Sequence, residues 1–197
     1  QLMLGSVLFH VGVLIIFGGH FVGLLTPIEV FDAIGVSHGA KQVLAIIAGG
    51  IAGAMAIVGA LILLHRRVFD PRIRATSSFG DTAILALLTA QLVLGLSTIP
   101  LSSQHLDGSE MVKFMAWAQG IFTFQPGAAA HISEVHWIFK AHLALGLTIF
   151  LVFPFTRLVH MLSAPIWYLN RRGWQLVRTR RGMADQKSRA RPSRGGR

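Results

Sequence analysis

LFHVGVLIIFGGHFVGLLTP (residues 8–27) holds two histidines, His10 and His20, inside an otherwise apolar stretch. A second stretch, HLALGLTIFLVFPFTRLVH (residues 142–160), places His142 and His160 in a similar setting. An unsatisfied imidazole at hydrocarbon depth costs roughly 2–7 kcal/mol, so each of these side chains needs a partner or a task. Two such pairs suggest two bound metal centres.

The composition indicates a membrane protein. The chain has 197 residues, of which 53% are hydrophobic and only 13% are charged. These values favour a helical bundle in a bilayer over a soluble domain. Cysteine is absent, which excludes disulfides and thiolate-held iron–sulfur clusters within this chain. Any redox role must therefore rest on histidine.

Four segments are long enough to cross about 30 Å of hydrocarbon, which takes roughly 20 helical residues. They are residues 2–25, 43–64, 82–101 and 137–162. The first lacks the basic start and small-residue cleavage site of a signal peptide. We expect an all-α polytopic membrane helix bundle of four spans as one domain over residues 1–170, and a basic cytoplasmic tail over residues 171–197.

The net charge of +10 is unevenly distributed along the chain. Four arginines fill the loop after the second span, and more than half of the 18 basic residues follow residue 170. This asymmetry puts loop 65–81 and the C-terminus in the cytoplasm, and loops 26–42 and 102–136 outside. The arginines then face membrane lipids or a docked subunit, and no nucleic-acid partner is predicted.

The topology pairs the histidines by depth. His10 and His160 lie nearer the cytoplasm, and His20 and His142 lie nearer the outside. Ten helical residues rise about 15 Å while 18 rise about 27 Å, so the two helices must tilt or kink to match. Pro154 lies between the second pair and offers a cause for a kink.

Two axial imidazoles from facing helices make a six-coordinate haem iron, which suits electron transfer. Small residues near the histidines would make room for the macrocycle between the first and last spans: Gly12, Gly18, Gly19, Gly23, Ala141, Ala144 and Gly146. The alternative is that the histidines bond across helices and the glycines serve ordinary close packing. We expect the remaining five histidines to have structural or interfacial roles: His38, His65, His105, His131 and His136.

Several stretches resemble one protein family. They are LFHVGVLIIFGGHFVGLLTP (8–27), RRVFDPRIRAT (66–76), LGLSTIPLSSQHLDGSEMVKFMAWAQGIFTF (94–124) and FPFTRLVHMLSAPIWYL (153–169). They are similar to the gamma, or cytochrome b, subunit of membrane-bound respiratory nitrate reductase. The resemblance covers about residues 4–180, and the SSQHLDGSEM loop is specific to it.

The resemblance implies two b haems, the inner one held by His10 and His160 and the outer one by His20 and His142. It also implies that quinol is oxidised near the outer haem, in a pocket with Gly19 and Lys41. Electrons then pass to an iron–sulfur beta subunit and a molybdenum-containing alpha subunit in the cytoplasm, as in nitrate reductase (quinone) of anaerobic respiration. The resemblance also implies a bacterial or archaeal cell (inner) membrane.

Other interpretations stay open from the residues alone. Lys41, just before the second span, is also explained by interfacial snorkelling. The chain as a whole could be a histidine-bearing transporter, a cytochrome b subunit of another quinone-linked oxidoreductase, or a haem-free anchor. Transporters tend to show matching repeats, and none is visible here. The family usually has five spans, with an additional helix before the first of the four expected here.

Overall fold

The computed structural model describes residues 2–161, whose regular elements are all helices. The four long ones are α1 (Leu2–Leu25), α3 (His38–Phe69), α5 (Phe79–Ser102) and α7 (Trp137–Val152). Each is long and apolar enough to cross a membrane, α7 together with the turn that follows it. The prediction of an all-α chain with four spans is therefore confirmed.

Shorter helices connect or follow the spans. They are α2 (Ile28–Ala33), α4 (Pro71–Thr76), α6 (Ser109–Phe122), and the 3-10 helices η1 (Ala128–Ile132), η2 (Phe153–Phe155) and η3 (Arg157–Met161). The chain divides into two compact units, Gln1–Val159 and His160–Arg197. The predicted tail, residues 171–197, lies outside the described residues.

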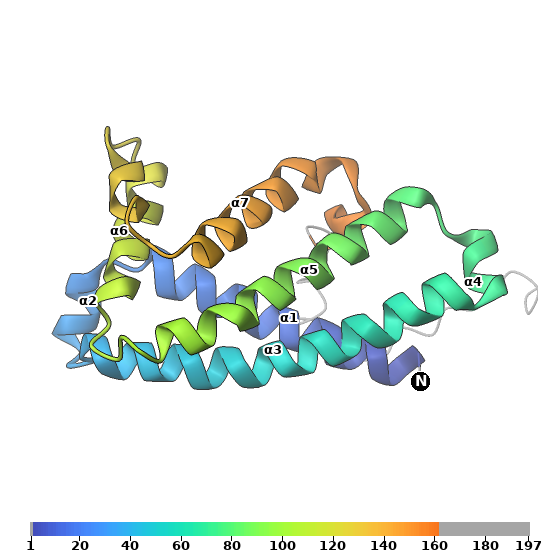
Figure 1. Ribbon diagram of the computed structural model, residues 1–197, viewed down its shortest axis with the longest axis horizontal. Helices are drawn as coiled ribbons and strands as arrows, with labels where there is room; N and C mark the ends of the chain where they lie inside the picture. Colours follow the sequence, from blue (N-terminus) through green and yellow to red (C-terminus); the bar gives the residue numbers. More distant parts are fainter. Residues whose placement is uncertain (1, 162–197) are drawn as a thin grey trace, which may run out of the picture. The chain divides into compact units, whose positions relative to one another are not determined.

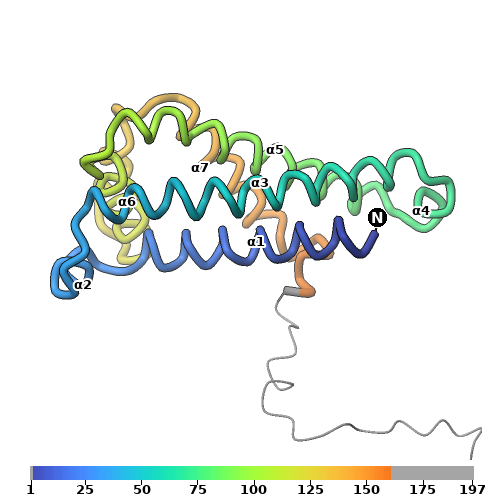
Figure 2. The backbone as a smooth tube through the Cα atoms, turned by 90° about the horizontal axis from the view of Figure 1, so that it is seen from below, coloured from blue at the N-terminus to red at the C-terminus, as the bar shows by residue number. Residues whose placement is uncertain are grey.

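Within the first unit, the spans pack in chain order. Helix α1 contacts α3, α3 contacts α5, and α5 contacts α7 (Figure 1). Helix α4 lies at the end of the bundle where α1 begins, and α2 and α6 lie at the opposite end (Figures 1 and 2). Loops 26–42 and 102–136 thus share one end, while loop 65–81 occupies the other, which is the separation that the charge pattern predicts.

Small residues bring α1 and α3 into close contact. A Cβ atom added to Gly12 would lie 2.6 Å from the carbonyl oxygen of Ala52 and 2.7 Å from the backbone nitrogen of Ala56. A Cβ atom added to Gly59 would lie even closer to the backbone nitrogen of Phe9, and one added to Gly5 would lie 2.8 Å from the Ile62 side chain. Such contacts let two helices associate in lipid through van der Waals packing. Gly12 therefore serves helix packing and does not make room for a cofactor, contrary to the expectation from sequence.

Local sequence sets the helix ends more sharply than hydropathy does. Helix α3 begins well before residue 43 because the Ser37 side chain accepts a hydrogen bond from the backbone N–H of Ala40. Ser78 and Asp81 form a reciprocal capping box at the start of α5. The described part of the last predicted span, 137–162, is interrupted where Pro154 led us to expect a kink. Its α-helical part ends at Val152, because Pro154 has no N–H to continue the ladder, and 3-10 turns follow.

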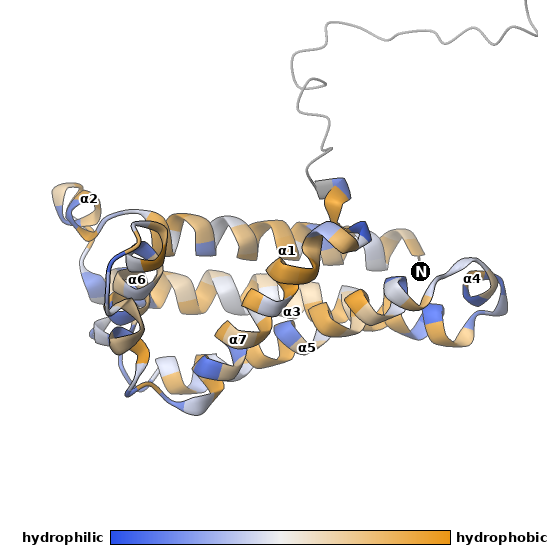
Figure 3. Cartoon of the chain, turned by 90° about the horizontal axis from the view of Figure 1, so that it is seen from above, coloured by the Kyte–Doolittle hydropathy of each residue, from blue (hydrophilic) through white to orange (hydrophobic). Residues whose placement is uncertain are grey.

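Apolar side chains cover the outside of the spans. Hydrophobic residues run along all four long helices, while hydrophilic ones gather at the connecting segments (Figure 3). The buried core is small and centres on Phe9, Ala60 and Leu85, whereas large residues such as Leu14 and Phe150 are exposed. A bilayer solvates such a surface, so this distribution supports membrane insertion.

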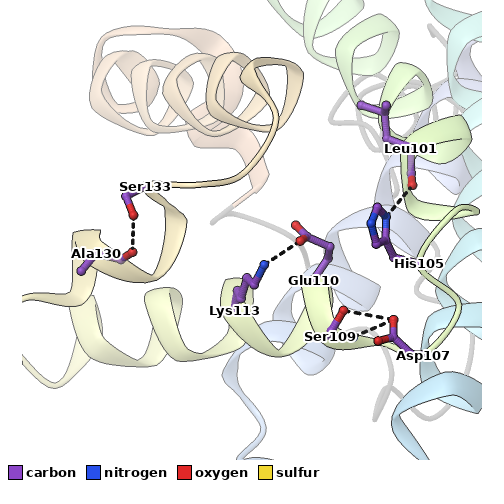
Figure 4. Close-up of polar contacts among 8 residues, drawn as sticks. All are labelled: Leu101, His105, Asp107, Ser109, Glu110, Lys113, Ala130 and Ser133. Carbon is purple, nitrogen blue, oxygen red and sulfur yellow. Dashed lines mark hydrogen bonds and ion pairs between the residues drawn. The ribbon is translucent and has the colours of Figure 1, made fainter.

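The end of the bundle with α6 carries a network of polar contacts. Gln119 of α6 donates from Nε2 to the carbonyl oxygens of Leu24, at 3.1 Å, and Thr26, at 3.2 Å, which ties α6 to the end of α1. Figure 4 shows separate polar contacts near the start of α6, where Ser109 donates to the Asp107 carboxylate. These hydrogen bonds hold the pKa of the Asp107 carboxyl below its usual value.

Candidate functional site

Two of the four membrane histidines have their rings close together. The His20 ring on α1 and the His142 ring on α7 have centroids 6.2 Å apart, with 48° between their planes. Two imidazoles that share one metal ion, with metal–nitrogen bonds of about 2 Å, have centroids about 6 Å apart. The spacing therefore fits two histidines that would hold one metal ion between them.

Hydrogen bonds within α1 set the chemistry of its histidines. The Nδ1 atom of His20 lies 2.8 Å from the carbonyl oxygen of Ile16, and that of His10 lies 2.7 Å from the carbonyl oxygen of Ser6. A carbonyl can only accept, so each Nδ1 carries the proton. In His20 the lone pair of Nε2 is then available to bind a metal.

His142 sits against α5 instead of bonding to its own helix. A Cβ atom added to Gly95 would lie 3.0 Å from the His142 Cε1 atom, so the imidazole occupies the space that this glycine leaves. Gln91, one turn earlier on α5, donates from Nε2 to the His142 carbonyl oxygen at 3.1 Å. The Nδ1 atom of His142 is buried and has no hydrogen-bond partner among residues 2–161.

These features fit a haem that is bound by two histidines. Among the described residues, no group of three or more histidine, aspartate or glutamate side chains could hold a metal ion. A six-coordinate haem needs only two protein ligands, because the macrocycle supplies the other four nitrogens. The donor set, the ring spacing and the free Nε2 atom of His20 all suit that group.

The structure does not test the second expected pair of ligands, His10 with His160. His10 lies on α1, and His160 is the first residue of the second compact unit, within η3. The pairing of His10 with His160 stays a prediction. Pro154 does interrupt the helix between His142 and His160, as the sequence led us to expect.

Lys41 is buried at the start of α3. The residue is only 7% exposed. Its Nζ atom lies 2.8 Å from the Met115 sulfur and 3.7 Å from the centre of the Phe31 ring. No carboxylate of residues 2–161 lies within 4.0 Å of Nζ. Lys41 therefore does not snorkel to solvent, and its ammonium is held by soft, weakly accepting groups.

Gly19 precedes His20 and borders open space. Nothing lies within 4 Å of the position that a Cβ atom would take there, and the same holds for Gly18 and Gly23. Gly19 lies near the end of α1 and Lys41 near the start of α3. These two helix ends lie at the end of the bundle that carries α6 (Figure 1). The face of α1 that carries Gly19 therefore has no close neighbour among the described residues.

The other five histidines have contacts of ordinary structural kinds, or none described. His38 pairs with Asp32 at 3.4 Å, and His65 meets Phe69 edge to ring. His136 caps α7 by accepting a hydrogen bond from the backbone N–H of Ile138, and His105 lies 3.4 Å from the Leu101 carbonyl oxygen. His131 lies in η1 and is exposed.

Comparison with known proteins identifies the family. The family model for the nitrate reductase gamma subunit matches residues 1–180. The chain is 51% identical to the respiratory nitrate reductase 1 gamma chain of Escherichia coli (strain K12), over 90% of this chain and 78% of that protein. The chain belongs to the nitrate reductase gamma subunit family. It is also 39% identical to the nitrate reductase gamma chain of Bacillus subtilis (strain 168), over 87% of this chain and 76% of that one.

A more distant relative is the Hdr-like menaquinol oxidoreductase cytochrome b-like subunit of Archaeoglobus profundus, with 24% identity over 85% of this chain and 48% of that protein. The family resemblance read from sequence is confirmed, and the chain is a membrane subunit of a nitrate reductase. A gamma subunit implies partner subunits in one complex, and both the family and the apolar helices support a bacterial membrane location.

The sequence analysis did not identify the residues that contact His142 and Lys41. Gly95 lies against the His142 ring, Gln91 bonds to the His142 carbonyl oxygen, and Met115 and Phe31 contact the Lys41 ammonium. One signal was available, because Gln91 is an uncharged polar residue in the middle of an apolar span. Met115 and Phe31 are ordinary apolar residues, and only the fold reveals their contacts with Lys41.

Proposed function

We propose that this gamma subunit is a dihaem cytochrome b that oxidises quinol near the outer membrane face. In this proposal His20 and His142 hold an outer haem, and His10 and His160 hold an inner haem. Quinol binds in a pocket with Gly19 and Lys41. Electrons pass through the haems to an iron–sulfur beta subunit and a molybdenum-containing alpha subunit on the cytoplasmic side, where nitrate is reduced.

The observation that carries the proposal is the facing pair of His20 and His142. Their 6.2 Å centroid distance suits two ligands of one iron, and the Nδ1 hydrogen bond of His20 directs its Nε2 atom toward that role. Bound haem supplies a reversible one-electron redox centre. The protein contributes two neutral imidazoles at a fixed spacing between α1 and α7, within the apolar part of the bundle.

Lys41 has the properties that a quinol pocket requires. Its Nζ atom has three N–H donors, and a methionine sulfur and an aromatic ring satisfy it only weakly. A quinone oxygen is a better acceptor than either neighbour. The ammonium can orient quinol by donating a hydrogen bond, and it favours the deprotonated oxygen that develops as quinol loses its protons.

The proposed position of the pocket explains how oxidation conserves energy. Each quinol that becomes quinone releases two protons and two electrons. Protons released at the outer face stay outside, while electrons move inward through the chain. Each charge that crosses a potential of 100 mV is worth about 2.3 kcal/mol, so the separation of protons from electrons charges the membrane.

The names of the relatives support both parts of the proposed function, membership of a nitrate reductase complex and oxidation of quinol. The Escherichia coli and Bacillus subtilis proteins are nitrate reductase gamma chains, and the Archaeoglobus profundus protein is named a menaquinol oxidoreductase cytochrome b-like subunit. That last name also favours a second candidate, a cytochrome b subunit of another quinone-linked oxidoreductase. Quinol-dependent reduction of nitrate by the purified complex distinguishes the two.

The decisive experiment counts haems in single variants. The wild-type complex should show two b haems in its reduced-minus-oxidised spectrum and redox titration. His20→Leu and His142→Leu should each remove the same, outer haem, and His10→Leu should remove the other. His65→Leu is the matched control and should keep both. Absence of haem from the wild type, or loss of one shared centre in the His10 and His20 variants, would refute the proposal.

A further inference from the structure

One of the proposed outer-haem ligands lacks the hydrogen bond that its counterparts have. His10 and His20 each donate from Nδ1 to the carbonyl oxygen four residues earlier in α1. The His142 Nδ1 atom is buried without a partner. Histidine ligands almost always donate their second ring nitrogen to an acceptor, which fixes the tautomer and the ring orientation. An acceptor for the His142 Nδ1–H group must therefore be a group other than the carbonyl oxygen four residues earlier in its own helix.

An unused acceptor lies on the helix that His142 contacts. Gln91 Oε1 on α5 is buried and also has no hydrogen-bond partner. The amide nitrogen of the same side chain donates to the His142 carbonyl oxygen at 3.1 Å, so the carboxamide already lies against this residue. A buried unpaired donor and a buried unpaired acceptor in one interface would relieve each other's lost hydration by pairing.

Two glycines fix the place of this contact. A Cβ atom at Gly146 would lie 3.1 Å from Gln91 Nε2, so the carboxamide fills the space beside that residue of α7. One turn along α5, a Cβ atom at Gly95 would lie 3.6 Å from His142 Nδ1 and 3.7 Å from Nε2. The edge of the ring that holds Cε1 and Nδ1 thus faces α5, the helix that carries Gln91.

We propose that Gln91 is a positioning residue of the outer haem site, and that its Oε1 atom accepts a hydrogen bond from the Nδ1–H group of His142 when Nε2 binds iron. The inference rests on the proposed ligand role of His142. The bond would hold the imidazole in one tautomer and one orientation. It would also make the imidazole a stronger electron donor, which favours ferric over ferrous iron and lowers the haem potential.

The test measures both haem potentials in the full membrane complex. Gln91→Leu removes the acceptor at similar volume and should raise the outer-haem potential, weaken retention of that haem by about 10- to 100-fold, and leave the inner haem unchanged. Gln91→Glu keeps an accepting oxygen and should return the potential to the wild-type value or below it. Gln42→Leu removes another buried glutamine, which donates to the Ser102 carbonyl oxygen, and should change neither potential.

Each outcome decides the matter. An unchanged outer-haem potential in Gln91→Leu, an equal shift of both haems, or a glutamate variant that behaves like the leucine variant would overturn the inference. If the leucine variant fails to assemble, Gln91→Met replaces it, because methionine fills the same volume with an unbranched chain. A wild-type complex without an outer haem would instead refute the proposed function, so the two failures are distinguishable.

Discussion

Gly12→Ala should destabilise the protein, whereas the same change at Gly49 should not. A Cβ atom at Gly12 would lie 2.6 Å and 2.7 Å from backbone atoms of α3, while nothing lies within 4 Å of a Cβ atom at Gly49. Both glycines are inside helices, at positions where alanine improves helix propensity by a similar amount. The difference between the two variants therefore isolates the steric effect.

The size of that effect follows from the distances. Carbon contacts are ordinarily about 3.5–4.0 Å, so α1 and α3 must separate locally by roughly 1 Å to accept the methyl group. The atoms in contact with Gly12 belong largely to the backbone of Ala52 and Ala56, which cannot rotate away. Overpacking of this kind costs about 1–3 kcal/mol in the free energy of unfolding. Each kcal/mol lowers the melting temperature of a chain this size by about 2–4 °C.

Thermal melts of the two alanine variants in the same detergent measure the difference. Gly12→Ala should melt below the wild type and Gly49→Ala at or above it. Because His20 is on α1, displacement of that helix should also lower the ratio of haem to protein in Gly12→Ala if the outer haem is bound as proposed. Equal melting temperatures in the two variants would refute the packing argument, whatever the haem content.

Three further outcomes are expected. Lys41→Ala should slow quinol oxidation severely while both haems and electron entry from an artificial donor to the cytoplasmic subunits are retained, and normal quinol turnover would place the pocket elsewhere. Asp81→Asn should lower the melting temperature, because the side chain loses the charge that pairs with Arg157. The Asp81 side chain is 4% exposed, and the Arg157 Nε atom lies 2.7 Å from its Oδ1 atom. An unchanged melting temperature would show that this ion pair is energetically neutral. Ser109→Ala should raise the pKa of the Asp107 carboxyl toward its usual value, since one donor to the charged form is lost, and a titration followed by NMR would detect it. The depressed pKa means that these hydrogen bonds stabilise the protein above the unfolded-state pKa of Asp107, and that this contribution is lost as the pH falls through the folded-state value.

The membrane spans could be predicted because length and hydropathy alone define them, and the first predicted span coincides with α1. The helix ends could not be predicted in the same way, because they depend on single side chains such as Ser37 and on Pro154. Helix α6 lies in a segment interpreted only as an outer loop. Its apolar residues are too few for a span, so the hydropathy criterion does not detect it.

Part of the candidate site could be predicted, because the position of a residue along a spanning helix sets its depth in the membrane. The predicted depths put His20 and His142 at the same level of the membrane, and in the structure the centroids of their rings are 6.2 Å apart. Depth carries no information on which side chain of a neighbouring helix faces a given ring. The contacts of His142 with Gln91 and Gly95 depend on the rotation of α5 about its axis, which apolar residues on all sides leave undetermined in the sequence.

The single amide of Gln119 that bonds to the carbonyl oxygens of Leu24 and Thr26 has a consequence for local unfolding. The last carbonyl groups of a helix lack intrahelical donors, and they ordinarily exchange partners with water as the helix end frays. Here two carbonyl groups at and just beyond the end of α1 are held by α6. Fraying of that end must break the contact with α6, so hydrogen exchange in the two segments should be coupled as one cooperative unit.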